Sequence, residues 1–257
     1  MSYIEYHVPP VVKAFSTCRD GGCGEGAYAS FNCTHYCGDN PVHVSANRER
    51  LCTDWQIAPD RLFIPRQVHD TRIAIVDEAF LAESMSRQTE LLEGVDALVS
   101  PLPQCCLAVS TADCVPVLLY DERNGIIAAI HAGWRGTVAG IVWKTLDLMA
   151  RRYGTLGEDV KAAIGPSISQ ASFEVGDEVY QAFEKAGFPM GQIAVRREKW
   201  HIDLWEANRI QLRERGVLPL CIEVAGICTY QQVDRFFSAR RLGIMSGRIL
   251  TGIMREL

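Results

Sequence analysis

The chain has 257 residues, of which 48% are hydrophobic and 22% are charged, and its formal net charge is −5. This composition is typical of a globular protein with enough apolar material for a large core. The acidic balance argues against nucleic acid as a partner, because phosphate backbones are bound by clustered Lys and Arg. The start MSYIEYHVPP lacks the features of a signal peptide, and no run approaches the roughly 20 apolar residues of a membrane helix. We therefore expect a cytoplasmic protein that binds neither nucleic acid nor membrane.

Ten cysteines are many for such a chain. Disulfide frameworks are typical of short secreted chains, so reduced thiols are expected in a longer chain without an export signal. Several of the cysteines lie in or beside apolar runs, where a free thiol packs as a small hydrophobe. We expect buried, structural roles for most of them, among them Cys105, Cys106, Cys221 and Cys228.

The first 60 residues are rich in glycine, cysteine and asparagine. The stretch CRDGGCGEGAYASFNCTHYCGDN, residues 18–40, predicts loops. A helix is predicted to begin near Asp39-Asn40-Pro41, because a capping residue is followed there by a proline that can start a helix. We expect this helix to carry Val44, Asn47 and Leu51.

The next segment, residues 61–135, is rich in strands, because short apolar runs alternate with turn residues. The Asn124-Gly125 step is a strong signal for a hairpin between the last two runs. The predicted strands span residues 61–77, 95–100, 105–111, 115–121 and 125–132.

The remaining residues, 136–257, contain apolar residues at both helical and strand spacing. Apolar positions recur at helical spacing over 137–154, 175–187 and 201–217, and the first of these helices is predicted to end at Gly154. Strands are predicted over 160–166, 222–229 and 249–256. Because strands and helices intermix without strict alternation, we expect the α/β (α+β) class with a largely antiparallel or mixed sheet, and one domain over residues 1–257.

Three residues with unusual flanks follow or precede apolar runs: His69, Cys114 and His131. Histidine and cysteine are ligands that zinc prefers, and three protein ligands leave a fourth position open for water or substrate. Their spacing matches no short metal motif, so ordinary strand-end residues are the alternative. Asp113 and Arg135 beside two of them favour a metal site, since a carboxylate there can act as acid, base or supporting partner. Cys114 paired with a histidine also fits a thiol hydrolase without metal.

A rival metal site is offered by Cys18, Cys23, Cys33, His35 and Cys37. Their intervals lack the paired C-x-x-C of structural zinc sites, which favours ordinary loop residues. The nearby GGCGEG fits no established phosphate-binding motif. Arg19, Ser30 and Asn32 flank it and supply groups for an oxygen-rich ligand, with a flexible loop as the alternative.

Long ordered motifs carry a resemblance to a known family. RQVH, DALVS, STADCVPVLLYD, AAIHAGWRGTVAGIV, AAIGPSISQASFEVGDEV, HIDLWEANRIQL, ICTY and FFSARR resemble the laccase-domain family, also called multicopper polyphenol oxidase-like or YfiH/YlmD proteins. The resemblance runs from about Ser16 to the final strand. It implies a layered α/β sandwich similar to the toxin-deamidase fold, and a metal site of His69, Cys114 and His131 that usually holds zinc.

The same resemblance implies purine nucleoside chemistry. The expected activities are phosphorolysis of adenosine, inosine and S-methyl-5'-thioadenosine to free base and ribose 1-phosphate, and deamination of adenosine. An older assignment for the family is copper-dependent oxidation of phenols, and some members are linked to the editing of peptidoglycan precursors. The FNCTHYCGDN loop departs from the family pattern through its extra Cys and His.

The residues themselves help to choose among these activities. A multicopper site needs many histidines, and the chain has six, two of them in the proposed site, so zinc is favoured over copper. Phosphorolysis needs an anion site, and guanidinium groups bind phosphate in bidentate fashion. Arg19, Arg66 and Arg135 are the candidates for phosphate, and Asp113 is expected to handle a proton.

Overall fold

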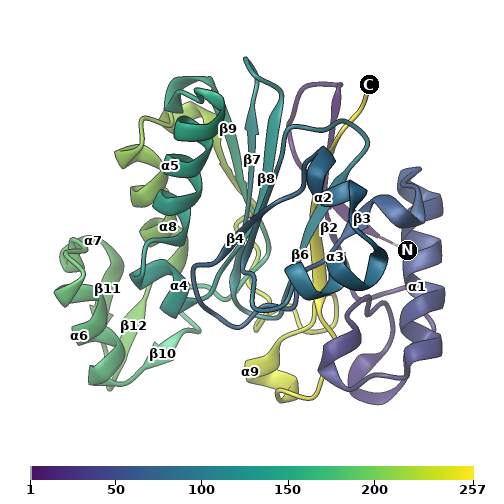
Figure 1. The fold of residues 1–257 in the computed structure, drawn as a ribbon. Coiled ribbons are helices and arrows are strands. Elements are labelled where there is room, and N and C mark those ends of the chain that lie inside the picture. Colours follow the sequence, from purple (N-terminus) through teal and green to yellow (C-terminus); the bar gives the residue numbers. More distant parts are fainter. Residues whose placement is uncertain (1) are drawn as a thin grey trace.

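Two β-sheets pack face to face, and helices cover the outer face of each sheet (Figure 1). The structure is a computed structural model and describes residues 2–257. The first sheet has five strands in the order β1 (Tyr3–Glu5), β2 (Val12–Thr17), β14 (Ile249–Arg255), β6 (Cys106–Thr111) and β3 (Leu62–Phe63). The second has six, in the order β13 (Ile222–Val224), β9 (Val160–Ile164), β7 (Val115–Asp121), β8 (Ile126–Ala132), β5 (Ala97–Ser100) and β4 (Ile73–Ile75).

A small third sheet lies beside the six-stranded one and contains β10 (Glu174–Val175), β12 (Trp200–Ile202) and β11 (Ala194–Arg196). Parallel pairing is confined to β3 with β6, β4 with β5 and β13 with β9, among the pairs of named strands in residues 2–257. The expected mixed and largely antiparallel arrangement is therefore confirmed.

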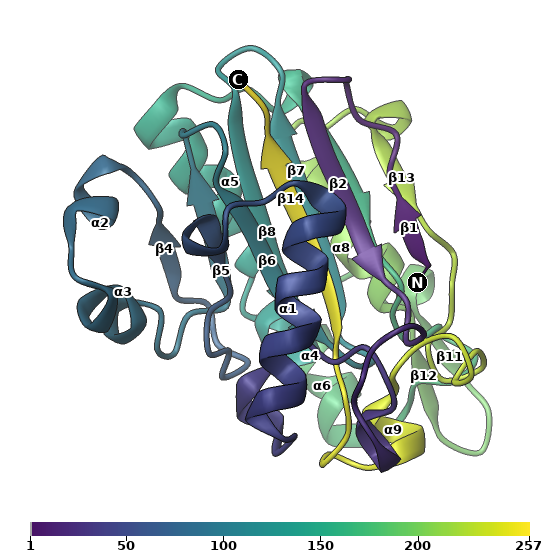
Figure 2. The same ribbon diagram turned by 90° about the vertical axis from the view of Figure 1, so that its right-hand side faces the viewer.

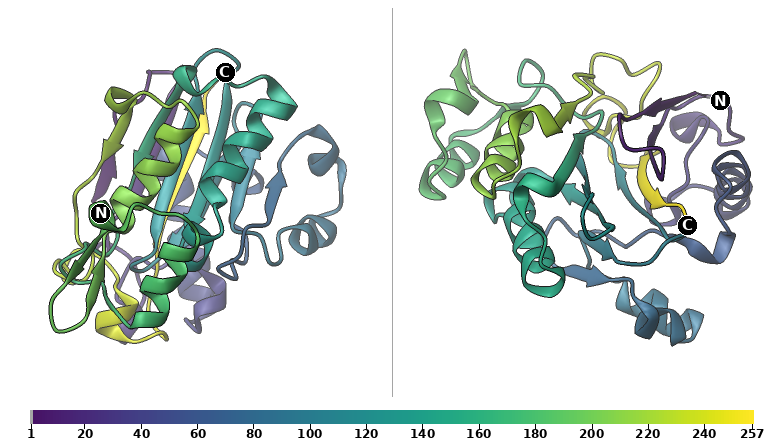
Figure 3. Two further views of the ribbon diagram at one scale, coloured as in Figure 1. Left: turned by 90° about the vertical axis from the view of Figure 1, so that its left-hand side faces the viewer. Right: turned by 90° about the horizontal axis from the view of Figure 1, so that it is seen from above.

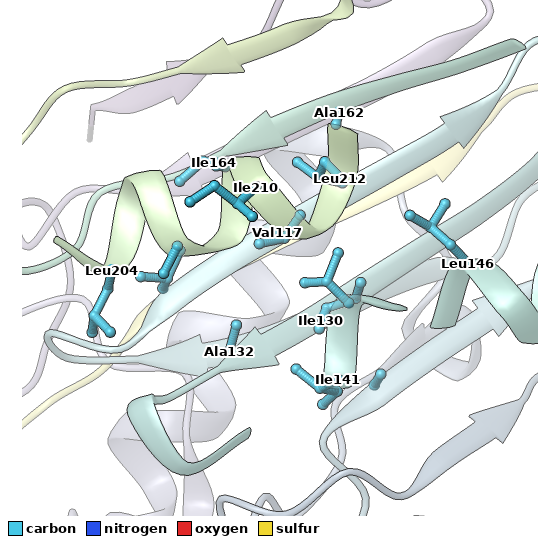
Figure 4. Packing of buried hydrophobic residues seen from close by; sticks show 14 of the residues in the cluster. Val117, Ile130, Ala132, Ile141, Leu146, Ala162, Ile164, Leu204, Ile210 and Leu212 are labelled. Carbon is cyan, nitrogen blue, oxygen red and sulfur yellow. The ribbon is translucent and has the colours of Figure 1, made fainter. Parts of the chain in front are cut away.

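Alternation along the central strands builds the layers. On β7, Leu118 and Tyr120 belong to the core between the two large sheets, whereas Val117 and Leu119 point to the helices on the outer face. This is the period of two that a strand buried on both faces requires. Those helices are α5 (Ile141–Tyr153) and α8 (Leu204–Glu214), which lie against the six-stranded sheet (Figures 3 and 4).

On the opposite side, α1 (Pro41–Trp55) covers the outer face of the five-stranded sheet (Figure 2). Leu51 of α1 and Phe15 of β2 are both fully buried in this third part of the core. The result is a four-layer α/β/β/α sandwich. The remaining helices are α2 (Glu78–Ala82), α3 (Met85–Leu91), α4 (Trp134–Val138), α6 (Asp177–Lys185), α7 (Met190–Ile193) and α9 (Ala239–Leu242).

Two local predictions are confirmed. The Asn40 side chain accepts a hydrogen bond from Val42 N at the start of α1, with Pro41 in the first turn. The β7–β8 hairpin turns at Gly125, whose φ of 70° needs a glycine. Within residues 2–257, no helix combines the length and apolar character that crossing a membrane requires.

Several predictions about elements were wrong. The strand predicted over 61–77 is interrupted by a loop between Phe63 and Ile73, and the strand predicted over 222–229 ends at Val224. The continuous helix over 137–154 is broken at Gly140, where a φ of 76° interrupts the helical path between α4 and α5. The helix predicted over 201–217 begins only at Leu204, because the Asp203 carboxylate caps it and the preceding residues form β12. Strands β1 and β2 occupy a segment for which only loops and a helix were predicted. β2 is buried on both faces and therefore shows no clean alternation.

Replacement of Leu118 by Ala should destabilise the protein by about 2–5 kcal/mol, because it leaves a cavity between the two sheets. Leu118 is 1% exposed, while Leu220 is fully exposed and makes Leu220→Ala the matched control. Chemical denaturation measures both. Equal stability of the two variants would contradict the packing described for the sheets.

Candidate metal centre and its surroundings

The register of the six-stranded sheet brings three chain segments to one end of the molecule. β5 and β7 start there and β8 ends there, since Ala97 pairs with Ile130 and Val115 pairs with Ala132. β4 runs parallel to β5, so the loop before β4 arrives at the same end. This loop carries His69, the residue before β7 is Cys114, and β8 carries His131.

The three predicted ligands converge. Each residue offers one ligand atom, and the three atoms from His69, Cys114 and His131 all lie within 4.8 Å of one another. Donor atoms around a tetrahedral zinc lie roughly 3.5 Å apart, so small side-chain adjustments close the set around an ion. His69 is exposed, Cys114 is half-buried and His131 is buried, which leaves the open side of the cluster facing solvent.

A buried carboxylate orients the His131 ring and holds the backbone at His69. Asp96 Oδ1 lies 2.7 Å from His131 Nδ1, and the same oxygen accepts a hydrogen bond of 2.9 Å from His69 N. Asp96 Oδ2 accepts hydrogen bonds from Val68 N and Asp70 N. When His131 Nδ1 carries the proton of its bond to Asp96, Nε2 is free to bind a metal, the usual arrangement of a ligating histidine.

The backbone at His69 adopts a left-handed conformation that is uncommon for a residue other than glycine. Its φ is 65°, and the bonds from Val68, His69 and Asp70 to Asp96 hold three successive peptide N–H groups around one carboxylate. Such a conformation persists only where surrounding contacts over-determine it. The candidate ligand His69 is therefore presented by a loop that Asp96 shapes.

A glycine leaves room for the cluster. A Cβ atom on Gly133 would lie 3.0 Å from His69 Cδ2, 3.2 Å from Cys114 Sγ and 3.6 Å from His131 Cε1. All three candidate ligands thus contact the space that a side chain at this position would fill. The HAGWRG motif supplies both the candidate ligand His131 and the glycine that leaves space beside it.

The electrostatics favour the metal-binding thiolate of Cys114 and, before a metal binds, the protonated form of His131. Burial raises the pKa of the Cys114 thiol, but the charge of His131 and hydrogen bonds from His131 and His69 lower this pKa to about 6. Burial lowers the pKa of His131, while Cys114 and Asp96 raise it, with a net increase. A thiolate is the form that binds metal, and it is also the nucleophilic form of cysteine.

Asp113 lies beside Cys114 but has its carboxylate engaged. Its Oδ1 accepts a hydrogen bond of 2.7 Å from Thr229 Oγ1, and its Oδ2 accepts one of 2.7 Å from Arg240 N. Its φ of 91° is again left-handed. Asp113 therefore ties the turn that carries Cys114 to the C-terminal segment of the chain.

Three predicted binding residues form a separate cluster around the glycine-rich loop. The Arg19 guanidinium donates to the carbonyls of Ala29 and Val233, and Ser30 Oγ donates to the Arg19 carbonyl. Asn32 is fully buried and donates to Asp39 Oδ2 at 2.8 Å. These side chains bind other parts of the protein and so hold the loop in place.

Arg66 lies outside the metal cluster as well. It is exposed and forms an ion pair of 3.3 Å with Glu93. Both residues line a cleft of about 840 Å³ between the 59–66 segment and α3, and none of the three candidate ligands lines this cleft. The structure therefore does not bring Arg66 together with His69, Cys114 and His131.

Arg135 is the exception among the three candidate arginines. It is exposed on α4, two residues after Gly133, and its guanidinium carbon lies 4.3 Å from the centre of the Trp134 ring. Among residues 2–257 it has neither an ion pair nor a side-chain hydrogen bond. Its N–H groups are available to a ligand.

The rival amino-terminal site does not form in the described part of the chain, where His69, Cys114 and His131 are the one group of three or more metal-ligating side chains that converge. Cys33 and Cys37 are buried, whereas Cys23 and His35 are exposed, so these side chains do not share one environment. Of the cysteines expected to be buried, Cys105, Cys106 and Cys228 are buried and Cys221 is half-buried.

Sequence reasoning missed Asp96 and Thr229. Asp96 had a usable signal, because it is an acidic residue in the otherwise apolar run VDALVS, and a fully buried carboxylate requires partners. Thr229 lies in the ICTY motif, but nothing in the sequence linked it to Asp113, which is 116 positions away in the chain. Only the fold shows that these two residues meet.

Comparisons with family models, curated proteins and solved structures all find matches over nearly the whole chain. A family model described as multi-copper polyphenol oxidoreductase laccase matches residues 13–256. A protein of Bacteroides thetaiotaomicron named purine nucleoside phosphorylase is 56% identical over 246 residues, covering 95% of this chain and 91% of its own. Adenosine deaminase RL5, from an unknown prokaryotic organism, is 46% identical over 248 residues, with coverages of 95% and 94%. The crystal structure of YlmD from Geobacillus stearothermophilus matches with a TM-score of 0.92 at 30% identity, covering 100% of this chain and 97% of its own.

Replacement of Asp96 by Asn should lower zinc affinity roughly 10- to 100-fold, because loss of a carboxylate behind a ligating histidine has an effect of this size. The new amide group would also face peptide N–H donors that now meet an oxygen. Asp70→Asn is the control, since the Asp70 carboxylate accepts from Thr71 N at the surface of the same loop. Competition with a chromophoric zinc chelator measures both affinities. Equal zinc affinities of Asp96→Asn and the wild-type protein would show that Asp96 does not support the metal site.

Replacement of Gly133 by Ala should weaken metal binding about tenfold or more, an effect comparable to losing the support of a ligand. The added methyl group would press on His69 and Cys114 at the distances given above. Gly191→Ala is the matched control, because no atom lies within 4 Å of a Cβ there and the residue is in α7. Zinc titration and a thermal melt separate loss of metal from loss of fold. Full zinc affinity in Gly133→Ala would contradict this placement.

Proposed function

The chain belongs to the multi-copper polyphenol oxidoreductase laccase family, and we propose that it is a purine nucleoside enzyme with a zinc ion held by His69, Cys114 and His131. The observation that carries the proposal is the convergence of these three side chains, with one side open, at one end of the sandwich. The relatives named purine nucleoside phosphorylase and adenosine deaminase support two reactions at this site.

The first reaction is phosphorolysis of adenosine, inosine or S-methyl-5'-thioadenosine, which transfers the sugar from the base to phosphate and leaves ribose 1-phosphate or its methylthio counterpart. The second is deamination of adenosine, in which water replaces the exocyclic amine. The substrates are therefore a purine nucleoside and either phosphate or water. Such substrates fit a cytoplasmic enzyme, and the shared core of the two large sheets supports one domain over residues 1–257.

Zinc fits the donor set better than copper. One thiolate and two imidazoles suit a single zinc with an open position, whereas multicopper oxidation needs several metal ions with many histidine ligands. Residues 2–257 contain one converging group of three or more ligands, and it holds two of the six histidines. We therefore propose a mononuclear site and no oxidation of phenols.

Each residue of the site has a separate task. A zinc ion held there would supply Lewis-acid polarisation of the substrate or of water. Asp96 fixes the ring of His131 and the loop of His69. Asp113 fixes the turn of Cys114, since both of its oxygens already accept hydrogen bonds, and proton transfer by Asp113 would require loss of one of them. Arg135 is the candidate that remains free to hold phosphate.

A metal-free cysteine hydrolase is the second candidate, and the lowered pKa of Cys114 beside His131 favours it. In this reading Cys114 attacks the substrate and His131 takes up the thiol proton. Treatment of a sample shown to lack metal with a thiol alkylator separates the two readings. Activity in that sample, abolished by alkylation, would support the hydrolase and exclude a zinc enzyme.

Replacement of His131 by Ala should remove bound zinc and activity together, because a ligand that Asp96 orients is lost. His7→Ala is the control, since the His7 side chain is 96% exposed and pairs with Glu223 at the surface. Elemental analysis of purified protein gives the metal content. A nucleoside panel with and without phosphate gives the two activities. Retained nucleoside turnover in metal-free His131→Ala would refute the proposal.

A further inference from the structure

We propose that Arg241 and Arg135 form a phosphate-binding site beside the metal centre, one arginine from each side of Cys114. This inference rests on the proposed function and adds to it the residue that makes phosphate the acceptor. Arg241 ends the FFSARR motif, but the sequence predicted no role for this residue. The geometry around its guanidinium carries the argument.

Arg241 is exposed on α9, and its guanidinium carbon lies 5.1 Å from the centre of the Tyr230 ring. Its backbone N–H donates to Ser238 Oγ, which caps the helix. In the described residues its side chain has neither an ion pair nor a hydrogen bond to the protein. The Tyr230 ring covers one face of the Arg241 guanidinium, and the N–H groups at its edge are left without a partner in the described residues.

Contacts place Arg241 near Cys114. Both carboxylate oxygens of Asp113 accept hydrogen bonds from residues next to the stacked pair Arg241–Tyr230. One donor is Thr229, which precedes Tyr230, and the other is Arg240, which precedes Arg241. Asp113 is itself adjacent to Cys114. The stacked pair is thus attached, through two hydrogen bonds of 2.7 Å, to the turn that presents a metal ligand.

Arg135 repeats this arrangement on the other side. Its guanidinium stacks 4.3 Å over Trp134, and the preceding Gly133 lies against Cys114 Sγ. α4 is also held firmly, because Gln211 and Asn208 of α8 donate to the Thr137 carbonyl and hydroxyl oxygens. The two stacked arginines therefore belong to segments that both contact the Asp113-Cys114 turn, one at α4 and the other at α9.

Stacking prepares an arginine for an oxyanion. The interaction with the ring uses the flat face of the guanidinium and leaves its N–H fork for bidentate bonding to phosphate. The ring also limits the conformations of a long side chain, so less entropy is lost when the anion binds. Two such groups suit a doubly charged phosphate.

Other arginines of the C-terminal segment are already committed to acceptors in the protein. Arg240 Nη1 donates to the Glu174 carbonyl, Arg235 Nη1 to Gln232 Oε1, and Arg248 to the carbonyls of Ser246, Gly247 and Ile244. Among the arginines of residues 229–248, Arg241 is the one whose guanidinium lacks such an acceptor. This difference singles it out for a ligand.

The two proposed reactions provide an internal test, because deamination of adenosine does not use phosphate. Arg241→Gln should raise the KM for phosphate in phosphorolysis roughly 10- to 100-fold, the loss expected for a charge-assisted bidentate contact. Deamination of adenosine without phosphate should stay within about twofold of wild type. Arg241→Lys, which keeps the charge and loses the fork, should give an intermediate KM.

Arg196→Gln is the matched control, since Arg196 stacks 5.0 Å over Trp200 but pairs with Asp177 at 2.9 Å. It should leave the KM for phosphate unchanged. Calorimetric titration of the zinc-loaded protein with inorganic phosphate measures binding without turnover. Binding should be weakened in Arg241→Gln and retained in the control.

An unchanged KM and unchanged phosphate binding in Arg241→Gln would overturn the inference. So would a parallel loss of phosphorolysis and deamination, which would show that Arg241 only supports the fold. If the wild-type protein turns over no nucleoside, the proposed function fails. In that case phosphate titration of wild type and Arg241→Gln still decides whether this anion site exists.

Discussion

The buried carboxylate of Asp96 is the group on which the site depends. It is fully buried, and a carboxylate in that position is unfavourable unless hydrogen bonds compensate for lost hydration. Three backbone N–H groups of residues 68–70 and the His131 ring supply this compensation. They also lower the pKa of Asp96 against the effect of burial, so the group stays charged. One interaction thus shapes the loop of one ligand and fixes the ring of another.

This arrangement requires a correct strand register. The backbone of His131 donates to the Asp96 carbonyl at 2.8 Å, which continues the pairing of β8 with β5 to the end of the sheet. A shift of one residue would turn His131 to the opposite face and separate it from both Asp96 and Cys114. The hairpin at Asn124-Gly125 fixes the pairing of β7 with β8 at their far end. The same strand pairing therefore determines both the packing between the two sheets and the geometry of the candidate metal centre.

The sequence predicted the parts that depend on local chemistry. The cap at Asn40, the turn at Gly125 and the ligand types of His69, Cys114 and His131 could each be read from neighbouring residues. The break at Gly140 was missed because apolar spacing continues across it, while the backbone conformation changes. The state of the arginines could not be predicted, because their acceptors come from distant segments: Val233 for Arg19 and Glu93 for Arg66. Whether an arginine is free for a ligand depends on tertiary contacts.

The fold supports the proposed metal site and the proposed anion site through different residues. Asp96 supports the metal ligands from inside the six-stranded sheet, whereas Asp113 joins the Cys114 turn to the segment that contains Tyr230 and Arg241. Cys114 is the residue at which both supports meet. On the proposed assignment, a change in the C-terminal segment would alter the use of phosphate without disturbing Asp96. Relatives named for phosphorolysis and for deamination on one scaffold are consistent with this division.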